Sequence, residues 1–427
     1  MDMRISQITS GQIFDSRGVP TVEARVMLED GSVGTASVPS GASTGTNEAH
    51  ELRDGGDRYG GRGVLQAVEH VSGEIASALM GMDALDQRAL DAALVALDDT
   101  ADKHHLGANA MLAVSMANAR AAAASLGVPL YRLIGGMSPC GTPLPMMNIL
   151  NGGLHADNNV DIQEFMIVPV GADSFDEAMR MGTDVYRALK QLLKRGGHPT
   201  AVGDEGGFAP NLEDDEQALQ VISEAIVQAG YAPGDEVAIS LDCAASGWID
   251  GDGYRLPKRD RRMSRAQLVD WYASLAEKYE LFSIEDPLGE EDFEGFAEMT
   301  ERMGEDVLIV GDDLFTTNPR RLARGMSLGA ANAILIKPNQ IGTLTETLDV
   351  MTSARIGGYQ AIVSHRSGET ADSFISDLAV GMGAPLFKAG APARGERVEK
   401  YNRMLRIEWE LSCGGMQALE DELSRVL

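Results

Sequence analysis

Alternating apolar and polar residues predict a small antiparallel sheet near the start of the chain. The run from Thr21 to Leu28 alternates with the period of a half-buried strand, and a second run, Ser32 to Val38, follows it across Asp30-Gly31. Asp-Gly between two such runs is a strong hairpin signal. Residues 39–46 are small and include two glycines, so we expect a mobile loop there.

Helical periodicity replaces this pattern after the loop. Apolar residues recur at helical spacing over residues 64–79, 86–97 and 108–126. The last of these runs is rich in alanine and ends at Gly127, with Pro129 beyond it, which is a typical helix stop.

A repeated strand–helix unit follows from about residue 235 onward. Short apolar runs each end in a polar or charged residue, and helical patterns such as 264–278 and 318–328 lie between them. The polar residues are, in order, Asp242, Glu285, Asp312, Lys337, His365 and Lys388. Polar residues at the carboxyl ends of successive strands are typical of a (β/α) barrel. An open, doubly wound sheet is the alternative, but its polar residues would gather at one switch point.

The length of the chain leaves room for a second domain. A barrel takes about 250 residues, and the chain has 427. We place the boundary where the pattern changes, so that residues 1–138 form a smaller α+β domain and residues 139–427 form the barrel.

Charge and cysteine content narrow the possible functions. A net charge of −28 argues against nucleic-acid binding, and it would repel an anionic substrate unless bound cations offset it. No secretory signal or apolar run of membrane-spanning length, about 18 residues, is visible. The three cysteines are odd in number and lack a CxxC spacing. We therefore expect a cytoplasmic protein without nucleic-acid or membrane partners.

Three acids at successive strand ends predict a metal site. The carboxyl ends of barrel strands converge, and Asp242, Glu285 and Asp312 would repel one another unless a cation lay among them. Oxygen ligands without cysteine or paired histidine favour a hard ion, Mg²⁺ before Zn²⁺. Each acid alone is compatible with an ordinary polar strand end, but three in register favour the metal.

Cationic and hydroxyl side chains end the later strands. Lys337 near bound Mg²⁺ would have a lowered pKa, which suits a base, although a lysine that only pairs with a neighbouring acid is the alternative. His365, Arg366 and Ser367 offer donors suited to phosphate, and Lys388 adds a further cation. The pattern predicts a site for a small, metal-chelating, phosphorylated anion.

Two earlier segments add a carboxamide and further acids. Gln163-Glu164 and Asp204-Glu205 are polar pairs, and two nearby carboxyl groups can hold one proton between them, which suits a general acid. Gly206-Gly207 beside the second pair is equally consistent with a plain turn.

One motif points to a different chemistry. Residues 41–45 match the GxSxG pattern of a hydrolase nucleophile. That pattern requires a strand-to-helix turn in a parallel sheet, and here only a hairpin precedes it, so we do not expect a hydrolase.

Taken in order, short motifs along essentially the whole chain resemble the enolase family. They are Asp15-Ser16-Arg17-Gly18, Ser40 to Gly45, Asn151 to Ala156, Gln163 to Met166, Gly203 to Pro210, Leu241 to Ala244, Ser283 to Asp286, Gly311 to Leu314, Asn339 to Gly342 and Ser364 to Thr370.

The resemblance implies a fold and a reaction. The fold is a smaller α+β N-terminal domain before a (β/α)8-type barrel whose second strand is antiparallel. The reaction is the reversible removal of water from 2-phosphoglycerate, with two Mg²⁺ per site, in a homodimer or higher homo-oligomer.

The resemblance also implies roles for single residues. Lys337 is similar to the base that removes the proton beside the carboxylate, and Glu205 to the acid that protonates the leaving hydroxyl, with Glu164 and His155 beside it. Asp242, Glu285 and Asp312 resemble the ligands of one Mg²⁺. The implied substrate contacts, of which Ser43 also helps to bind the second Mg²⁺, are Ser43, Gln163, His365, Arg366, Ser367 and Lys388.

Five positions depart from the family pattern. The family usually has Asn at Val19, an apolar residue other than proline at Pro338, Glu at Ala371, Thr at Ala389 and Ser at Gly395. A paralogue acting on a related phosphonate or phosphorylated carboxylate is therefore an alternative. A non-catalytic structural or surface-binding protein is a third reading, but it would need none of the chemical residues.

Overall fold

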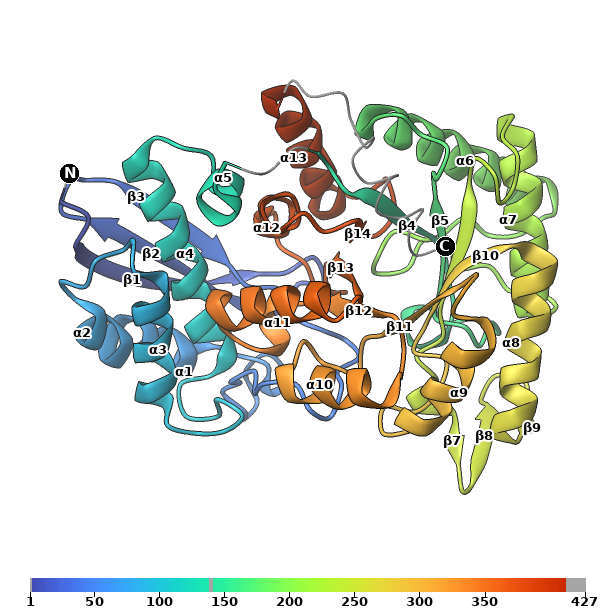
Figure 1. The fold of residues 1–427 in the computed structure, drawn as a ribbon, viewed down its shortest axis with the longest axis horizontal. Helices are drawn as coiled ribbons and strands as arrows, with labels where there is room; N and C mark the ends of the chain where they lie inside the picture. The colour runs from blue at the N-terminus through green and yellow to red at the C-terminus, as the bar shows by residue number, and fades with distance from the viewer. Residues whose placement is uncertain (1, 138–140, 412–427) are drawn as a thin grey trace.

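The computed structural model describes residues 2–137 and 141–411 and arranges them in two parts, an N-terminal sheet with helices beside a barrel (Figure 1). The boundary predicted at residue 138 lies outside the described residues. No helix in the described part of the chain is both long enough and apolar enough to span a membrane.

A three-stranded antiparallel sheet forms the N-terminal domain. Strands β1 (Ile5–Phe14), β2 (Pro20–Leu28) and β3 (Val33–Ser37) pair in that order, and the predicted hairpin joins β2 to β3. Helix α4 (Ala108–Leu126) packs on β2 and β3. The approach is so close that a Cβ at Gly34 would lie 2.0 Å from the carbonyl oxygen of Ala117. Small residues on both surfaces permit this packing.

The helical runs predicted at 64–79 and 86–97 are helical in the structure, which also has the short helices η1 and α5 outside any predicted run. The run 64–79 is one helical stretch, but it contains a π-helical turn, which the periodicity did not reveal. The elements are η1 (Arg58–Gly61), α1 (Leu65–His70), η2 (Val71–Ile75), α2 (Ala76–Leu79), α3 (Gln87–Asp98) and α5 (Leu130–Gly135).

Eight strands close into the expected barrel. In order around the barrel they are β4 (Leu144–Asn151), β5 (Glu164–Val168), β6 (Ala238–Asp242), β10 (Leu281–Glu285), β11 (Leu308–Gly311), β12 (Ala333–Ile336), β13 (Gln360–Ser364) and β14 (Leu386–Lys388). All eight strands consist of buried residues, as a core between helices requires. The fold class inferred from the resemblance is confirmed.

The second barrel strand, β5, is antiparallel to both neighbours. Residues 152–163, which contain only the short helix η3 (Gly153–His155), join β4 to β5. A parallel pair usually needs a crossover that contains an α-helix, and this connection has none. Strand β5 therefore returns along β4.

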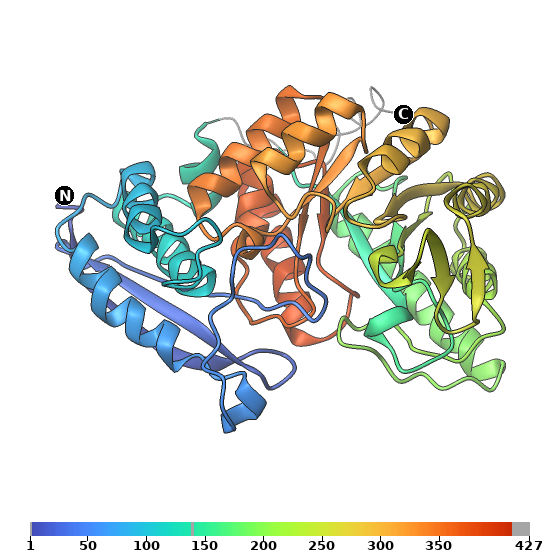
Figure 2. The same ribbon diagram turned by 90° about the horizontal axis from the view of Figure 1, so that it is seen from below.

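Helices surround the barrel, as both views show (Figures 1 and 2). They are α6 (Phe175–Arg195), α7 (Asp215–Ala229), α8 (Arg265–Tyr279), α9 (Phe293–Met303), α10 (Pro319–Leu328), α11 (Leu344–Ile356), α12 (Phe374–Met382) and α13 (Gly395–Leu411), with η4 (Ala245–Trp248) and η5 (Pro338–Gln340) in loops. A small sheet of β7 (Ile249–Asp250), β8 (Gly253–Leu256) and β9 (Arg261–Met263) is inserted after β6. The start of α8 has a full capping box between Ser264 and Gln267.

The loop after β3 crosses from the N-terminal domain onto the barrel (Figure 2). Its Ser40 exchanges both backbone hydrogen bonds with Gly368, and the Ala49 amide donates to the Gln340 carbonyl at 2.8 Å. The predicted mobility of residues 39–46 remains a prediction.

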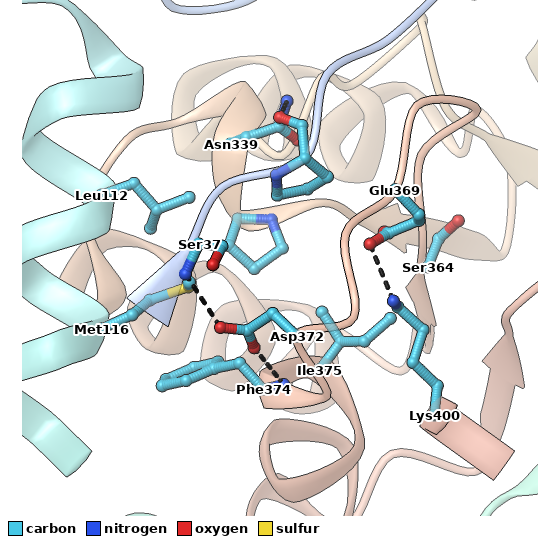
Figure 3. Close-up of a pocket in the computed structure, with 12 residues that line it drawn as sticks. Ser37, Leu112, Met116, Asn339, Ser364, Glu369, Asp372, Phe374, Ile375 and Lys400 are labelled. Carbon is cyan, nitrogen blue, oxygen red and sulfur yellow. Dashed lines mark hydrogen bonds and ion pairs between the residues drawn. The ribbon is translucent and has the colours of Figure 1, made fainter. Parts of the chain in front are cut away.

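A buried ion pair also joins the domains. Arg120 on α4 donates to both Asp372 oxygens at 2.6 and 2.7 Å, and the Ser37 amide donates to the same carboxylate at 2.9 Å. Figure 3 shows the pocket at this junction, where Leu112 and Met116 of α4 face Asp372 and Phe374. The Asp372 side chain is 8% exposed, and the Phe374 amide of the barrel domain also donates to it at 2.7 Å, so donors from both domains hold this carboxylate.

We expect Arg120→Met to lower the free energy of unfolding by about 2–3 kcal/mol, because it leaves a buried carboxylate without its charged donor. Urea unfolding followed by circular dichroism measures this. The matched control is Arg88→Met, since Arg88 makes an exposed bidentate pair with Asp349 across the same two domains. Equal losses in the two variants would contradict the importance of burial.

Candidate functional site

A polar cavity opens among the strand ends of the barrel. Apart from Glu285, every residue that the sequence predicted for the site lines it, together with Ser364. Glu285 contacts Lys388, one of the lining residues, at 2.8 Å. The predicted site residues therefore belong to one site, while their individual roles remain predictions.

The strand register places three carboxylates side by side. Glu164 on β5 pairs with Asp242 on β6, which in turn pairs with Glu285 on β10. Neighbouring residues across a ladder project to the same face, where like charges repel. All three residues are at most 5% exposed. This row would be unstable without a nearby cation.

The Lys388 ammonium supplies that positive charge. Its Nζ lies 3.0 Å from Glu164 Oε2, 3.4 Å from Asp242 Oδ2 and 2.8 Å from Glu285 Oε2. Burial lowers the pKa of Lys388, but the three carboxylates outweigh it and raise that pKa well above its ordinary value.

One ammonium cannot offset three buried carboxylates. Burial and the neighbouring acids raise the pKa of Glu164 to about 7. Burial and Asp242 likewise raise the pKa of Glu285 well above its ordinary value. The row therefore favours the binding of further positive charge, either as protons or as a cation.

Asp312 and Lys337 form a second ion pair in the cavity. The Lys337 ammonium donates to Asp312 Oδ2, and Gln340 donates to Asp312 Oδ1 at 3.0 Å. Burial lowers the pKa of Lys337, but Asp312 raises it above its ordinary value. The sequence argument expected a lowered pKa beside Mg²⁺, whereas in this arrangement Asp312 pairs directly with the lysine.

His155 lies between two carboxyl groups. Its Nδ1 is 3.4 Å from Glu164 Oε1 and 3.7 Å from Glu205 Oε1. Burial would raise the pKa of Glu205, but His155, His365 and Arg397 hold it well below its ordinary value. Since the pKa of Glu164 is about 7, the proton of this carboxyl pair rests on Glu164. The role of this carboxyl pair as a general acid stays a prediction.

Arg366 joins the loop to the cavity. Its guanidinium donates to both carboxylate oxygens of Glu48 at 3.0 and 3.1 Å and to the carbonyl of Ser43 at 3.1 Å. The Ala42 amide donates to Ser367 Oγ at 2.6 Å. The predicted phosphate donors therefore contact the loop that carries Ser43.

Sequence reasoning missed several residues that contact the predicted ones. Glu48 pairs with Arg366, Asn148 donates to Glu205 Oε2 at 2.9 Å, and Arg397 contacts His365. Of these residues only Glu48 had a signal in the local sequence, because it lies two residues beyond the glycine-containing loop 39–46 that the sequence singled out. Asn148 lies within a buried strand and Arg397 within a helix, where nothing in the sequence distinguishes them.

Two compact groups of possible metal ligands lie among the described residues. They are His155, Glu164 and Glu205, and Asp286, Asp312 and Asp313. The predicted trio Asp242, Glu285 and Asp312 is not one of these groups. The ammonium groups of Lys388 and Lys337 contact its carboxylates.

The predicted ligands nevertheless fit Mg²⁺ chemically. They offer only oxygen atoms, and Glu285 Oε1 is buried without a hydrogen-bond partner in the described part of the chain. A buried, unpartnered carboxylate oxygen is costly unless a cation binds it. The assignment of Asp242, Glu285 and Asp312 as ligands stays a prediction.

The departures near the site are accommodated locally. Pro338 is the first residue of η5, a position that needs no amide donor, and the Lys337 amide still donates to Thr317 Oγ1 at 2.9 Å. Ala389 is fully buried, while Ala371 and Gly395 are exposed. Val19 donates its amide to Asp15 at 2.9 Å, which any residue other than proline provides.

The GxSxG match does not form a nucleophile elbow. It follows β3, an edge strand of an antiparallel sheet, and no helix begins until Arg58. Ser43 belongs instead to the wall of the polar cavity.

Two family models match this chain. Residues 5–134 match the enolase N-terminal domain, and residues 140–423 match the enolase C-terminal TIM barrel domain.

We expect Lys388→Met to destabilise the protein by about 3–5 kcal/mol at pH 8, because it leaves a row of buried carboxylates without their cation. The loss should be smaller at pH 6. Removing the cation raises the carboxyl pKa values further, so the row becomes neutral by taking up protons. Chemical unfolding at both pH values measures the difference.

The matched control is Lys278→Met, whose lysine pairs with Glu216 on the surface. That variant should show little change at either pH. A loss for Lys388→Met that is the same at both pH values would contradict the charge argument.

Proposed function

This chain belongs to the enolase family, and from that membership we propose that it catalyses the Mg²⁺-dependent, reversible conversion of 2-phosphoglycerate to phosphoenolpyruvate and water. The observation that carries the proposal is the polar cavity. A buried lysine, a proton-sharing carboxyl pair and an uncompensated row of carboxylates lie around one space.

Lys337 is proposed as the base that removes the proton from C2. It lines the cavity just after β12, and β12 lies across the barrel from β5, which carries Glu164. A lysine must be neutral to accept a proton, and pairing with Asp312 favours the charged form. Engagement of Asp312 by another cation would weaken that pairing and favour the neutral amine.

The carboxyl pair is proposed to protonate the leaving hydroxyl group. Glu164 holds the resting proton and Glu205 delivers it, with His155 between them. The C3–O bond breaks, the oxygen leaves as water with this proton, and the electron pair left at C2 forms the double bond. The proton from C2 remains on Lys337, so charge and atoms balance.

Asp242, Glu285 and Asp312 would hold one Mg²⁺, and Ser43 would help to hold a second. When bound, Mg²⁺ supplies positive charge that stabilises the doubly negative carboxylate formed by loss of the C2 proton. Lys388 adds a protein cation to the same purpose, since it is buried and stays protonated.

Substrate binding is proposed to use the donors on the other wall. Arg366 and Ser367 suit the phosphate group, and Gln163 and His365 add polar contacts. Ser43, on the loop that Arg366 contacts, would complete the site when the substrate is bound. A cytoplasmic, glycolytic role as a homodimer or higher homo-oligomer is the corresponding proposal for the cell.

A paralogous activity on a related phosphonate or phosphorylated carboxylate is the second candidate. Pro338 and Ala389 favour it, because they directly follow Lys337 and Lys388, and misplacement by about 1 Å can cost roughly 100-fold in rate. A non-catalytic role has less support, since a structural protein would not need this buried, uncompensated charge.

Turnover of 2-phosphoglycerate should separate the roles of the base and the acid. Lys337→Ala is expected to abolish exchange of the C2 proton with solvent deuterium, because the base is lost. Glu205→Gln is expected to retain some exchange while forming little phosphoenolpyruvate. Proton NMR measures the exchange, and absorbance measures the product.

Both variants should melt as the wild type does if they act in the cavity. A folded, Mg²⁺-loaded wild type that neither exchanges the C2 proton nor forms product would refute the 2-phosphoglycerate assignment. Related phosphonates and phosphorylated acids would then be assayed in the same way.

Millimolar Mg²⁺ should raise the melting temperature relative to EDTA, because an ion bound only by the native state stabilises that state. Asp312→Ala should remove most of the shift. Asp349→Ala, which removes an exposed acid on α11, should keep it. A shift that survives in Asp312→Ala would contradict the ligand assignment.

A further inference from the structure

Arg397 on α13 is completely buried beside the cavity. Each of its two terminal nitrogens makes two hydrogen bonds. Nη1 contacts His365 Nδ1 at 2.6 Å and the Arg366 carbonyl at 2.5 Å. Nη2 donates to the carbonyls of Asp204 at 3.0 Å and Ser367 at 2.6 Å. The guanidinium therefore has an acceptor for each Nη hydrogen and cannot turn away.

The contact with His365 determines which ring nitrogen carries hydrogen. Arginine has five N–H donors, no acceptor, and stays charged in proteins. His365 Nδ1 must therefore accept, which requires its lone pair. A neutral His365 then carries its only hydrogen on Nε2, and a doubly protonated ring would lose this bond and face the guanidinium charge.

The Nε2 hydrogen points toward the reactive side of the site. His365 lines the cavity and is 2% exposed, and its Nε2 lies 3.5 Å from Glu205 Oε2. Nε2 is buried without a hydrogen-bond partner in the described part of the chain. It is therefore available to donate to a group that lies in the cavity beside both His365 and Glu205.

We propose that Arg397 is a positioning residue that fixes His365 as the neutral Nε2–H tautomer, so that His365 serves the reaction as a hydrogen-bond donor and not as a proton source. The tautomer follows from the contacts alone. Its part in the reaction rests on the proposed function, with Glu164 and Glu205 as the proton carriers.

The charges around His365 agree with this assignment. Glu205 faces it from one side and favours the cation, whereas Arg397 and Lys388 face it from α13 and β14 and oppose the cation. Burial is the largest influence, and the pKa of His365 is lowered to about 3. His155, in contrast, has a raised pKa because Glu205 and Glu164 outweigh its burial. The surroundings of His365 thus favour its neutral form, whereas those of His155 favour its protonated form.

Lys400 lies one turn further along α13 and provides a control. It distinguishes an effect on the His365 tautomer from a general loss of support for the loop. Its Nζ contacts Glu369 Oε2 at 2.8 Å and donates to the Thr370 carbonyl at 3.0 Å, as the Glu369 contact in Figure 3 shows. Lys400 is as buried as Arg397 and holds the same loop. Its hydrogen bonds and ion pair in the described part of the chain do not include His365, so it serves as the matched control.

The test is nitrogen NMR of the full-length protein labelled with ¹⁵N-histidine. Loss of one signal set in His365→Gln assigns the His365 ring. In the wild type we expect protonated Nε2 and unprotonated Nδ1 throughout about pH 6–8, where an ordinary histidine titrates. A cationic ring, or a ring protonated on Nδ1, would overturn the proposal without any variant at Arg397.

Variants then test the role of Arg397. Arg397→Met should give mixed tautomers, whereas Arg397→Lys should keep Nε2–H because one donor remains. Lys400→Met should leave the His365 nitrogens unchanged even if it lowers the melting temperature. Equal changes in Arg397→Met and Lys400→Met would show that Arg397 only supports the loop. If Arg397→Met does not fold, the wild type and Arg397→Lys still decide.

Kinetics with 2-phosphoglycerate test the role as donor. His365→Gln should lower kcat by about 100-fold, as loss of a preplaced donor does, without removing a limb from the pH profile of kcat. Loss of a limb would mean that His365 titrates during turnover and would overturn the donor role. If the wild type does not turn over this substrate, the proposed function fails, while the NMR result on the tautomer stands.

Discussion

The arrangement of the site depends on the electrostatic repulsion within one buried row of carboxylates. Glu164, Asp242 and Glu285 lie side by side because the strand register puts them there, and Lys388 is the only ammonium that contacts all three in the described part of the chain. A barrel core would not normally tolerate such a row, since burying unpaired charge is costly. The three acids therefore carry more negative charge than Lys388 offsets, and the site favours the binding of a further cation. A bound cation can offset this excess, and the same cation would attract an anionic substrate to a chain whose net charge is strongly negative.

The sequence allowed the parts with strong periodicity to be predicted. Six barrel strands could be recognised because each is a short apolar run ending in a polar residue. Strand β1 was missed because it is half-exposed and contains Gly11, and β4 was missed because it is buried throughout and has no regular alternation of apolar and polar residues. The antiparallel direction of β5 came from family resemblance alone. That direction matters chemically, because it puts Glu164, at the start of its strand, beside Asp242, at the end of its own.

The sequence was sufficient to predict which residues line the candidate site. It was not sufficient to predict how these residues pair with one another or which of them are charged. The strand-end argument and the family motifs located the residues around the cavity. They did not reveal that Asp312 holds Lys337 in its charged form, nor that Glu48 occupies Arg366. Glu48 and Arg366 are separated by more than three hundred positions in the chain. Pairings of that kind depend on how two domains meet, which local sequence patterns do not encode.

The position of Lys388 in the chain has a consequence for how the protein is made. Strand β14, which carries this lysine, pairs with β4 and so closes the barrel. All three acids of the row are synthesised before it, and a ribosome adds about 5–20 residues per second. Until β14 emerges, the nascent barrel has an open edge and a row of acids without their cation. Closure of the sheet and pairing of the row with its lysine therefore depend on the same strand, which is made after all three acids.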